Sequence, residues 1–211
     1  MATLLYITAH PGNLKASYSL SVGEKFVQAY KESNPGDEVV HVDLYQRDIP
    51  HIDVDVWEAW GILQNGGSFD QLTAAQQQKL AQLNTLLDEF VAADKYVFVT
   101  PMWNFSYPPV MKAYIDSFCV RAKTFKYTEN GPVGLLENKK AFHIQATGGI
   151  YSEGPVADRE NSSRHLKTVL NFVGITDFDN LFIEGVSTAG DRAPQIKADA
   201  IEKARIAAKN F

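Results

Sequence analysis

The chain has 211 residues and a net charge of −5, with 45% apolar and 21% charged residues. Because Lys and Arg are not in excess, it lacks the positive charge that binds a nucleic-acid backbone. Its single cysteine, Cys119, excludes an internal disulfide framework and a multi-cysteine zinc site.

Cys119 sits among apolar residues at helical spacing, so we expect a buried structural thiol. No segment reaches the roughly 18 apolar residues that a membrane-spanning helix needs. The first residues also lack the basic segment and cleavage site of a signal peptide. These features favour a reduced, cytoplasmic protein.

Five short runs rich in β-branched and aromatic residues predict strands. Three of them are almost continuously apolar, as expected of strands that helices cover on both faces, and the second alternates as an edge strand does. The expected strands are Leu4–Ala9, Glu38–Tyr45, Tyr96–Thr100, Ala141–Ala146 and Asn180–Val186.

Helical patterns separate these runs. One opens with Thr73 as an expected N-cap, and another starts at Pro108 and Pro109, where the missing N–H costs nothing. The expected helices are Ser19–Ser33, Thr73–Ala93, one beginning at Pro108, Ser163–Val173 and Ala193–Ala208.

Regular alternation of strand and helix predicts one α/β domain over residues 1–211, with a five-stranded parallel sheet and helices on both faces. The flavodoxin-like order 2-1-3-4-5 is the commonest arrangement of five such strands. Residues Ile49 to Asp70 form the longest insertion, which we expect to pack over the sheet or against a second subunit.

Ligands of such sheets bind beyond the carboxyl ends of the strands, where three loops are unusual. The first, Thr8 to Ser19, offers the hydroxyls of Ser17 and Ser19 and the backbone N–H groups of a helix start, which suit a terminal phosphate. The alternative is that one serine is only a helix cap. Neither G-x-G-x-x-G nor the P-loop motif occurs, which disfavours a Rossmann-bound dinucleotide and a P-loop nucleotide.

The other two loops suit a flat heteroaromatic ring. Pro101–Pro109 places aromatic residues and an Asn after a buried strand. These residues form either a rigid apolar shelf for a ligand or aromatic packing in the core under the loop. Ala146–Tyr151 contains Gly148 and Gly149, whose N–H groups can face a carbonyl oxygen or simply form a turn.

Four segments of the chain resemble one known family over almost its whole length. PMWNF at Pro101–Phe105, RAKTFKYTENGPVGLL at Arg121–Leu136, TGGIY at Thr147–Tyr151 and FVGI at Phe172–Ile175 are similar to the FMN-dependent NADH-azoreductases. These enzymes are also described as FMN-dependent NADH:quinone oxidoreductases. The start of the chain, through His10 and Pro11, resembles the wider quinone reductase family.

The resemblance implies non-covalent FMN, NADH as cosubstrate, and ping-pong hydride transfer through flavin N5 to quinones or aromatic azo compounds. It places the phosphate at Ser17, Tyr18 and Ser19, and the flavin ring along Pro101, Met102, Trp103, Asn104 and Phe105. Around the ring it adds His10, Ala146, Thr147, Gly148, Gly149 and Tyr151. His10 stands where some relatives have Ser, and Ala146-Thr147 where some have Ser-Arg, either of which can change the NADH or NADPH preference.

The resemblance also implies a homodimer with a shared active site, in which Tyr127 and Phe172 line the acceptor slot. The alternative for Phe172 is a place in the core, because Leu166, Val169 and Leu170 surround it on an expected helix. No side chain need act as a nucleophile, and no metal is implied.

Three other functions compete with this interpretation of the sequence. Gly185 to Ala189 approximates a hydrolase nucleophile elbow, but none of the five histidines follows Ser187, as that fold requires. The histidines are too scattered for a metal site, and His143 is expected to be a core or interface residue. A flavodoxin-like electron carrier differs from an enzyme in needing no substrate pocket.

Overall fold

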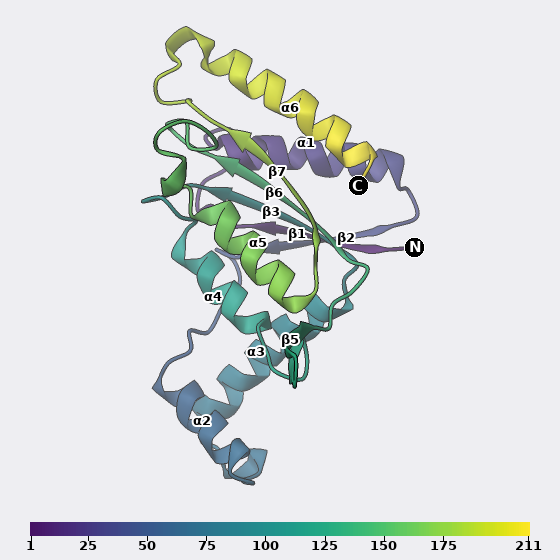
Figure 1. The fold of residues 1–211 in the computed structure, drawn as a ribbon, viewed down its shortest axis with the longest axis vertical. Coiled ribbons are helices and arrows are strands. Elements are labelled where there is room, and N and C mark those ends of the chain that lie inside the picture. The colour runs from purple at the N-terminus through teal and green to yellow at the C-terminus, as the bar shows by residue number, and fades with distance from the viewer.

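The structure is a computed structural model that describes residues 1–211, and its centre is a parallel sheet of five strands (Figure 1). The strands are β1 (Thr3–Thr8), β2 (Glu38–Asp43), β3 (Lys95–Pro101), β6 (Lys140–Ala146) and β7 (Asp177–Ile183), in the order β2-β1-β3-β6-β7. Apart from numbering, this is the predicted order, since β4 and β5 lie outside the sheet. The apolar runs of β1, β3 and β6 are almost fully buried, as predicted.

Six helices accompany the sheet. They are α1 (Tyr18–Ser33), α2 (Val54–Gln64), α3 (Ala74–Ala92), α4 (Pro109–Phe118), α5 (Ser162–Val173) and α6 (Ala193–Lys209). Helices α1 and α6 cover one face, while α3, α4 and α5 cover the other (Figure 1). Thr73 caps α3 and Pro109 opens α4, as the sequence predicts.

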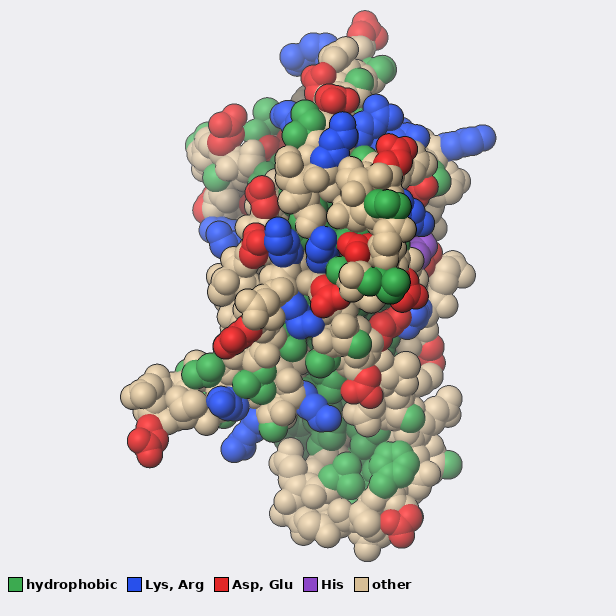
Figure 2. Space-filling model, turned by 90° about the vertical axis from the view of Figure 1, so that its right-hand side faces the viewer, with side chains coloured by type: hydrophobic (Ala, Val, Ile, Leu, Met, Phe, Trp, Pro, Cys, Tyr) green, Lys and Arg blue, Asp and Glu red, His purple; other side chains and the backbone are tan.

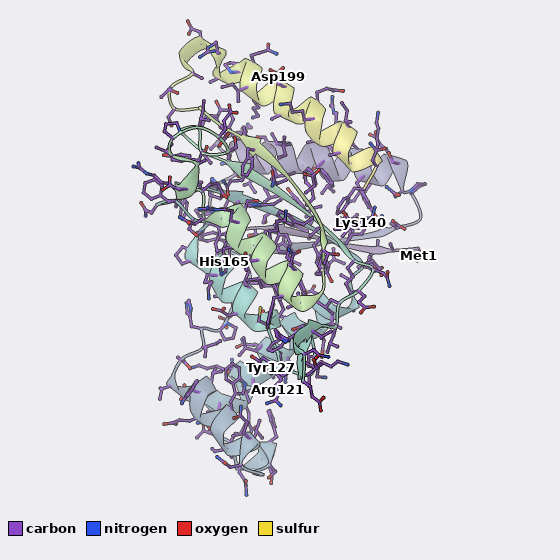
Figure 3. The ribbon with its side chains drawn as sticks, in the orientation of Figure 1. Met1, Arg121, Tyr127, Lys140, His165 and Asp199 are labelled. Atoms are coloured by element: carbon purple, nitrogen blue, oxygen red, sulfur yellow. The ribbon has the colours of Figure 1, made fainter.

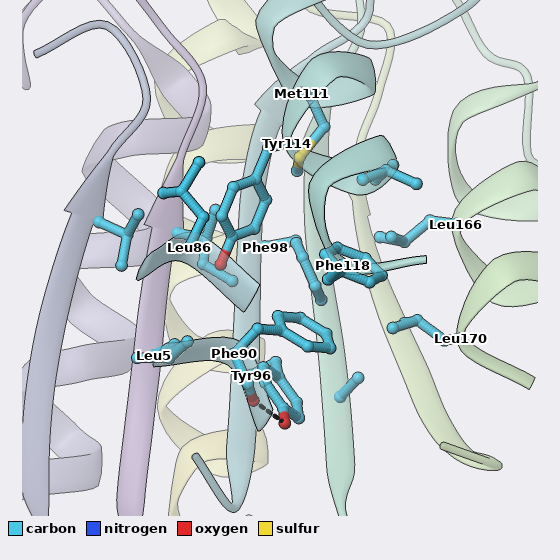
Figure 4. Packing of buried hydrophobic residues seen from close by; sticks show 14 of the residues in the cluster. Leu5, Leu86, Phe90, Tyr96, Phe98, Met111, Tyr114, Phe118, Leu166 and Leu170 are labelled. Carbon is cyan, nitrogen blue, oxygen red and sulfur yellow. Dashed lines mark hydrogen bonds between the residues drawn. The ribbon is translucent and has the colours of Figure 1, made fainter. Parts of the chain in front are cut away.

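The larger of two main core clusters lies between the sheet and α3, α4 and α5. There the rings of Phe90 and Phe118 stack in parallel with centroids 3.8 Å apart, and Tyr96 stacks on Phe90 (Figure 4). The Tyr96 hydroxyl donates a hydrogen bond of 2.7 Å to the Phe90 carbonyl, which satisfies its only buried polar atom. Cys119 ends α4 half-buried, and burial raises the pKa of its thiol to about 12, consistent with an unreactive structural residue.

Two elements differ from the prediction. The insertion contains α2, which packs on α3 through Val56, Ala59, Leu80 and Leu83 and lies at the end of the molecule rather than over the sheet (Figure 1). In addition, β4 (Phe125–Thr128) and β5 (Gly131–Gly134) form an antiparallel hairpin.

The last strand also begins three residues earlier than predicted, at Asp177. It is an edge strand, so Asp177 and Asp179 can face solvent within it.

Candidate active site

Three loops meet at the carboxyl ends of β1, β3 and β6, where the sequence places the site. The ring of His10 lies 6.5 Å from that of Trp103, centroid to centroid, and the ring of Phe105 lies 6.0 Å from that of Tyr151. The Met102 N–H donates to the Ala146 carbonyl at 2.8 Å. The structure therefore brings together residues that are up to 141 positions apart in the chain.

A tight turn shapes the second loop. Trp103 and Ser106 exchange two backbone hydrogen bonds of 2.6 and 3.0 Å, and the two residues between them have positive φ angles, 50° at Asn104 and 68° at Phe105. A phenylalanine in this left-handed region costs about 1–2 kcal/mol, and such strain is concentrated at functional sites. The turn leaves the N–H groups of Asn104 and Phe105 without a partner in the chain.

The aromatic rings of this loop face outward. Trp103 is 40% exposed and Phe105 43% exposed, so they do not pack into the core beneath the loop. Of the two alternatives left open by the sequence, the exposed apolar shelf is therefore the one observed.

The third loop completes a cavity of about 240 Å³ beside this shelf. Its lining residues are Met102, Asn104, Phe105, Thr147, Gly148, Gly149 and Tyr151. The carbonyls of Gly148 and Gly149 accept hydrogen bonds from Ser187 and Gly185, but their own N–H groups have no partner in the chain. The cavity is thus bordered by N–H donors that are fixed in place and free to bind a ligand.

Ser187 and Glu184 lie near this loop, although the sequence does not single them out as site residues. A Cβ at Gly148 would lie 2.5 Å from Ser187 Oγ, so a larger residue there would displace the serine side chain. Glu184 Oε1 accepts the backbone N–H groups of Tyr151 and Ser152 at 2.7 and 2.8 Å, which fixes the loop. Both residues follow the last strand at its carboxyl end, a position that could have identified them.

At the first loop, α1 presents a helix start with open donors. Ser17 Oγ accepts the Leu20 N–H at 3.2 Å and lies 3.1 Å from Ser19 Oγ, so Ser17 is a helix cap, and both serines are buried. The N–H groups of Tyr18 and Ser19 have no partner in the chain. Together with the helix dipole, they form an end of α1 that attracts an anion.

His10 adds a donor from the same loop. Its Nδ1 accepts the Gly12 N–H at 2.8 Å, and partial burial lowers the pKa of the ring. At neutral pH the imidazole is therefore uncharged and carries its proton on Nε2.

Behind the shelf lies a buried polar layer. His143 Nε2 lies 3.0 Å from Thr100 Oγ1, its Nδ1 has no partner, and burial lowers the pKa of the ring to about 3. His143 is thus a neutral core residue, as predicted, although only half of its polar atoms are satisfied. Tyr107 and His165 share a hydrogen bond that ties the second loop to α5.

Tyr127 and Phe172 lie elsewhere. Both rings contact Phe125: the centroid of Tyr127 is 5.6 Å away and that of Phe172, at the end of α5, is 4.6 Å away. Tyr127 lies on the hairpin, far from the loops of the site (Figure 3). Helix α5 starts at the site, where the Asn161 N–H donates to the Phe105 carbonyl, and at 1.5 Å per residue Phe172 is about 16 Å further along it. The structure therefore does not bring these two residues into the cavity of their own chain. Phe172 is 36% exposed, so it does not fill the core either.

Two further properties concern metal binding and membrane insertion. The structure contains no group of three or more His, Cys, Asp or Glu residues arranged to hold a metal ion. None of its helices is long and apolar enough to cross a membrane.

Comparisons with known proteins agree with this geometry. The family model described as "Flavodoxin-like fold" matches residues 2–207. The FMN-dependent NADH:quinone oxidoreductase of Bacillus pumilus is 58% identical, and the FMN-dependent NADH:quinone oxidoreductase 2 of Bacillus subtilis is 56% identical, both over 211 residues that cover all of each chain.

Among solved structures, an FMN-dependent NADH-azoreductase from Bacillus anthracis in complex with FMN has a TM-score of 0.93 and 33% identity. The alignment covers 100% of this chain and 99% of that one. The chain therefore belongs to the flavodoxin-like family of FMN-dependent NADH:quinone oxidoreductases and azoreductases.

Proposed function

We propose that this protein is an FMN-dependent oxidoreductase that uses NADH to reduce quinones and aromatic azo compounds. The observation that carries the proposal is the cavity between the second and third loops, which combines an exposed aromatic shelf with unpaired N–H groups. It occurs in a chain that is 58% identical to an enzyme named for this activity.

The residues present fit FMN at both of its ends. A phosphate needs several donors at a positively polarised position, which the open N–H groups of Tyr18 and Ser19 provide beside the hydroxyls of Ser17 and Ser19. A flat ring needs an apolar surface with a few fixed polar groups. That surface is available at Trp103 and Phe105.

We assign Met102, Asn104 and Tyr151 to direct contact with the flavin ring. His10 is assigned to donate a hydrogen bond to FMN from Nε2. Pro101, Ala146 and Thr147 are assigned to holding the two loops in place. Thr147 is buried and its N–H donates to the Ile183 carbonyl at 2.9 Å, while Ala146 accepts from Met102. These assignments follow the placement of each residue around one cavity.

When bound, FMN supplies two-electron chemistry by accepting a hydride from NADH and passing it to the acceptor. The chain's own task is to position the reactants and stabilise charge. The N–H groups of Gly148 and Gly149 are placed to stabilise negative charge on a bound ring, because they are fixed in advance by their own carbonyl hydrogen bonds. The rings of Phe105 and Tyr151 meet edge to face beside the cavity and add apolar surface to it.

We further propose that residues 1–211 form one domain and that two copies share each active site, in the cytoplasm. Tyr127 and Phe172 are exposed and lie too far from their own cavity, so they can line an acceptor slot only in a second chain. Apolar side chains also gather on the surface at the end of the molecule that α2 occupies (Figure 2). Val54 and Trp57 of α2 are 66% and 71% exposed and are suited to an interface.

The cofactor proposal is tested by acid release and chromatography. The purified protein should be yellow and release FMN, because the chain has a phosphate-sized helix start and no dinucleotide fingerprint. Released FAD, or a protein that binds no flavin when FMN is supplied, would contradict the proposal.

A further inference from the structure

A second cavity, of about 260 Å³, lies next to the proposed flavin site and is not used by it. It lies between the start of α5, strand β7 and the segment that follows the third loop. Tyr151 lines both this cavity and the one beside the aromatic shelf, so the two adjoin. A ligand longer than a single ring can therefore extend from one into the other.

The cavity carries two cations that have no anionic partner. Arg164 and Lys167 line it, are three residues apart on one face of α5, and take part in none of the ion pairs of the chain. Two unpaired cations in one cavity are notable in a protein whose net charge is −5. Together they favour a ligand with negative charge.

The arginine is also held in position. Its Nε donates to the Glu160 carbonyl at 2.7 Å, and a second guanidinium nitrogen donates to the Asp158 carbonyl. A guanidinium fixed in this way loses less conformational entropy when it binds a phosphate.

A buried hydroxyl supports a ligand independently. Ser163 lines the cavity and is only 3% exposed, yet its Oγ has no hydrogen-bond partner. Buried polar atoms are normally satisfied, so an unpaired hydroxyl beside a cavity is free to bond with a partner from outside the chain after a small side-chain rotation.

The carboxylate of Glu160 in the same wall is already engaged. Its oxygens accept the N–H groups of Ser163 and Arg164 at 2.9 and 3.3 Å and the Gln145 side-chain amide at 3.2 Å. These donors offset its charge within the fold, which limits its repulsion of an anion.

We propose that this cavity binds the diphosphate of NADH while the nicotinamide stacks on the flavin ring that the aromatic shelf supports. The proposal rests on the proposed function and adds to it a recognition site for one part of the substrate. Ser163, Arg164 and Lys167 are the residues that contact the diphosphate.

The test compares NADH with reduced N-benzylnicotinamide, a hydride donor without phosphates, using the FMN-loaded enzyme. Arg164→Ala/Lys167→Ala should lower kcat/KM for NADH about tenfold, because exposed cations contribute modestly but two act together. The kcat/KM for the phosphate-free donor should change less than twofold. Lys31→Ala/Lys209→Ala removes the same charge from exposed positions elsewhere and should change neither.

Equal losses for both donors, or no loss for NADH, would overturn the diphosphate site. A wild-type enzyme that oxidises neither donor would instead contradict the proposed function, so the two failures are distinguishable. ADP-ribose should compete with NADH in the wild type. Binding of inorganic pyrophosphate that leaves NADH turnover unchanged would identify a free-anion site and overturn the proposal.

Ser163→Ala gives an independent check. The hydroxyl has no partner in the chain, so removing it should leave the unfolding midpoint unchanged or slightly higher. The same variant should lower kcat/KM for NADH severalfold and spare the phosphate-free donor. A lower midpoint with unchanged NADH kinetics would show that the hydroxyl serves the fold and would contradict its assignment.

Discussion

His143 makes the stability of the fold depend on pH. Burial lowers the pKa of its ring from 6.5 to about 3, so below pH 6.5 the unfolded chain binds a proton that the folded chain does not. The contribution of the neutral His143 ring to the free energy of unfolding is therefore complete above pH 6.5. It is lost as the pH falls toward 3, by about 1.4 kcal/mol per pH unit.

Denaturant unfolding at several pH values checks this prediction. His143→Gln keeps a polar group beside Thr100 and should flatten the dependence between pH 6.5 and 4. An equally steep dependence in His143→Gln would show that another group is responsible.

Ser17 and Ser19 differ in what they do for the fold, which separates their effects. Ser17 caps α1, so Ser17→Ala should lower the free energy of unfolding of the apoprotein by about 1 kcal/mol, while Ser19→Ala should lower it less. If both hold the phosphate, the double variant should bind FMN at least tenfold more weakly by fluorescence titration, since each hydrogen bond to a charged group is worth about 1.5–3 kcal/mol. An unchanged dissociation constant would place the phosphate elsewhere.

At the scale of elements, predictability follows the hydrophobic pattern. Strands β1, β3 and β6 are buried on both faces, so their apolar runs identify them and place the three loops at the carboxyl ends of the sheet. Helix α2 was not predicted, because it buries only Val56 and Ala59 and exposes Trp57, which obscures the helical stripe.

The hairpin β4–β5 was missed for a related reason. Each strand has four residues, and Tyr127 and Val133 are exposed in it, so no alternation between a buried and an open face marks the strands.

Unpaired N–H groups and the positive φ angles at Asn104 and Phe105 depend on loop geometry, which composition does not encode.

For the whole molecule, Phe172 tests whether two chains share a site. Because its ring is 36% exposed, Phe172→Ala should shift the unfolding midpoint little, whereas Phe118→Ala, which empties a fully buried position, should cost about 3–5 kcal/mol. Phe172→Ala should nevertheless change the Michaelis constant and preference for acceptors. Light scattering should show a dimer, and a fully active monomer would rule out the shared site.

This chain with FMN is expected to be a complete enzyme, and steady-state turnover is the most direct measurement of that. Purified protein, FMN, NADH and a quinone, with no partner protein, should give NADH oxidation with parallel lines in double-reciprocal plots, because the two substrates react in turn at the same flavin ring. Absence of NADH oxidation until a partner protein is added would contradict the assignment as an enzyme and indicate an electron carrier.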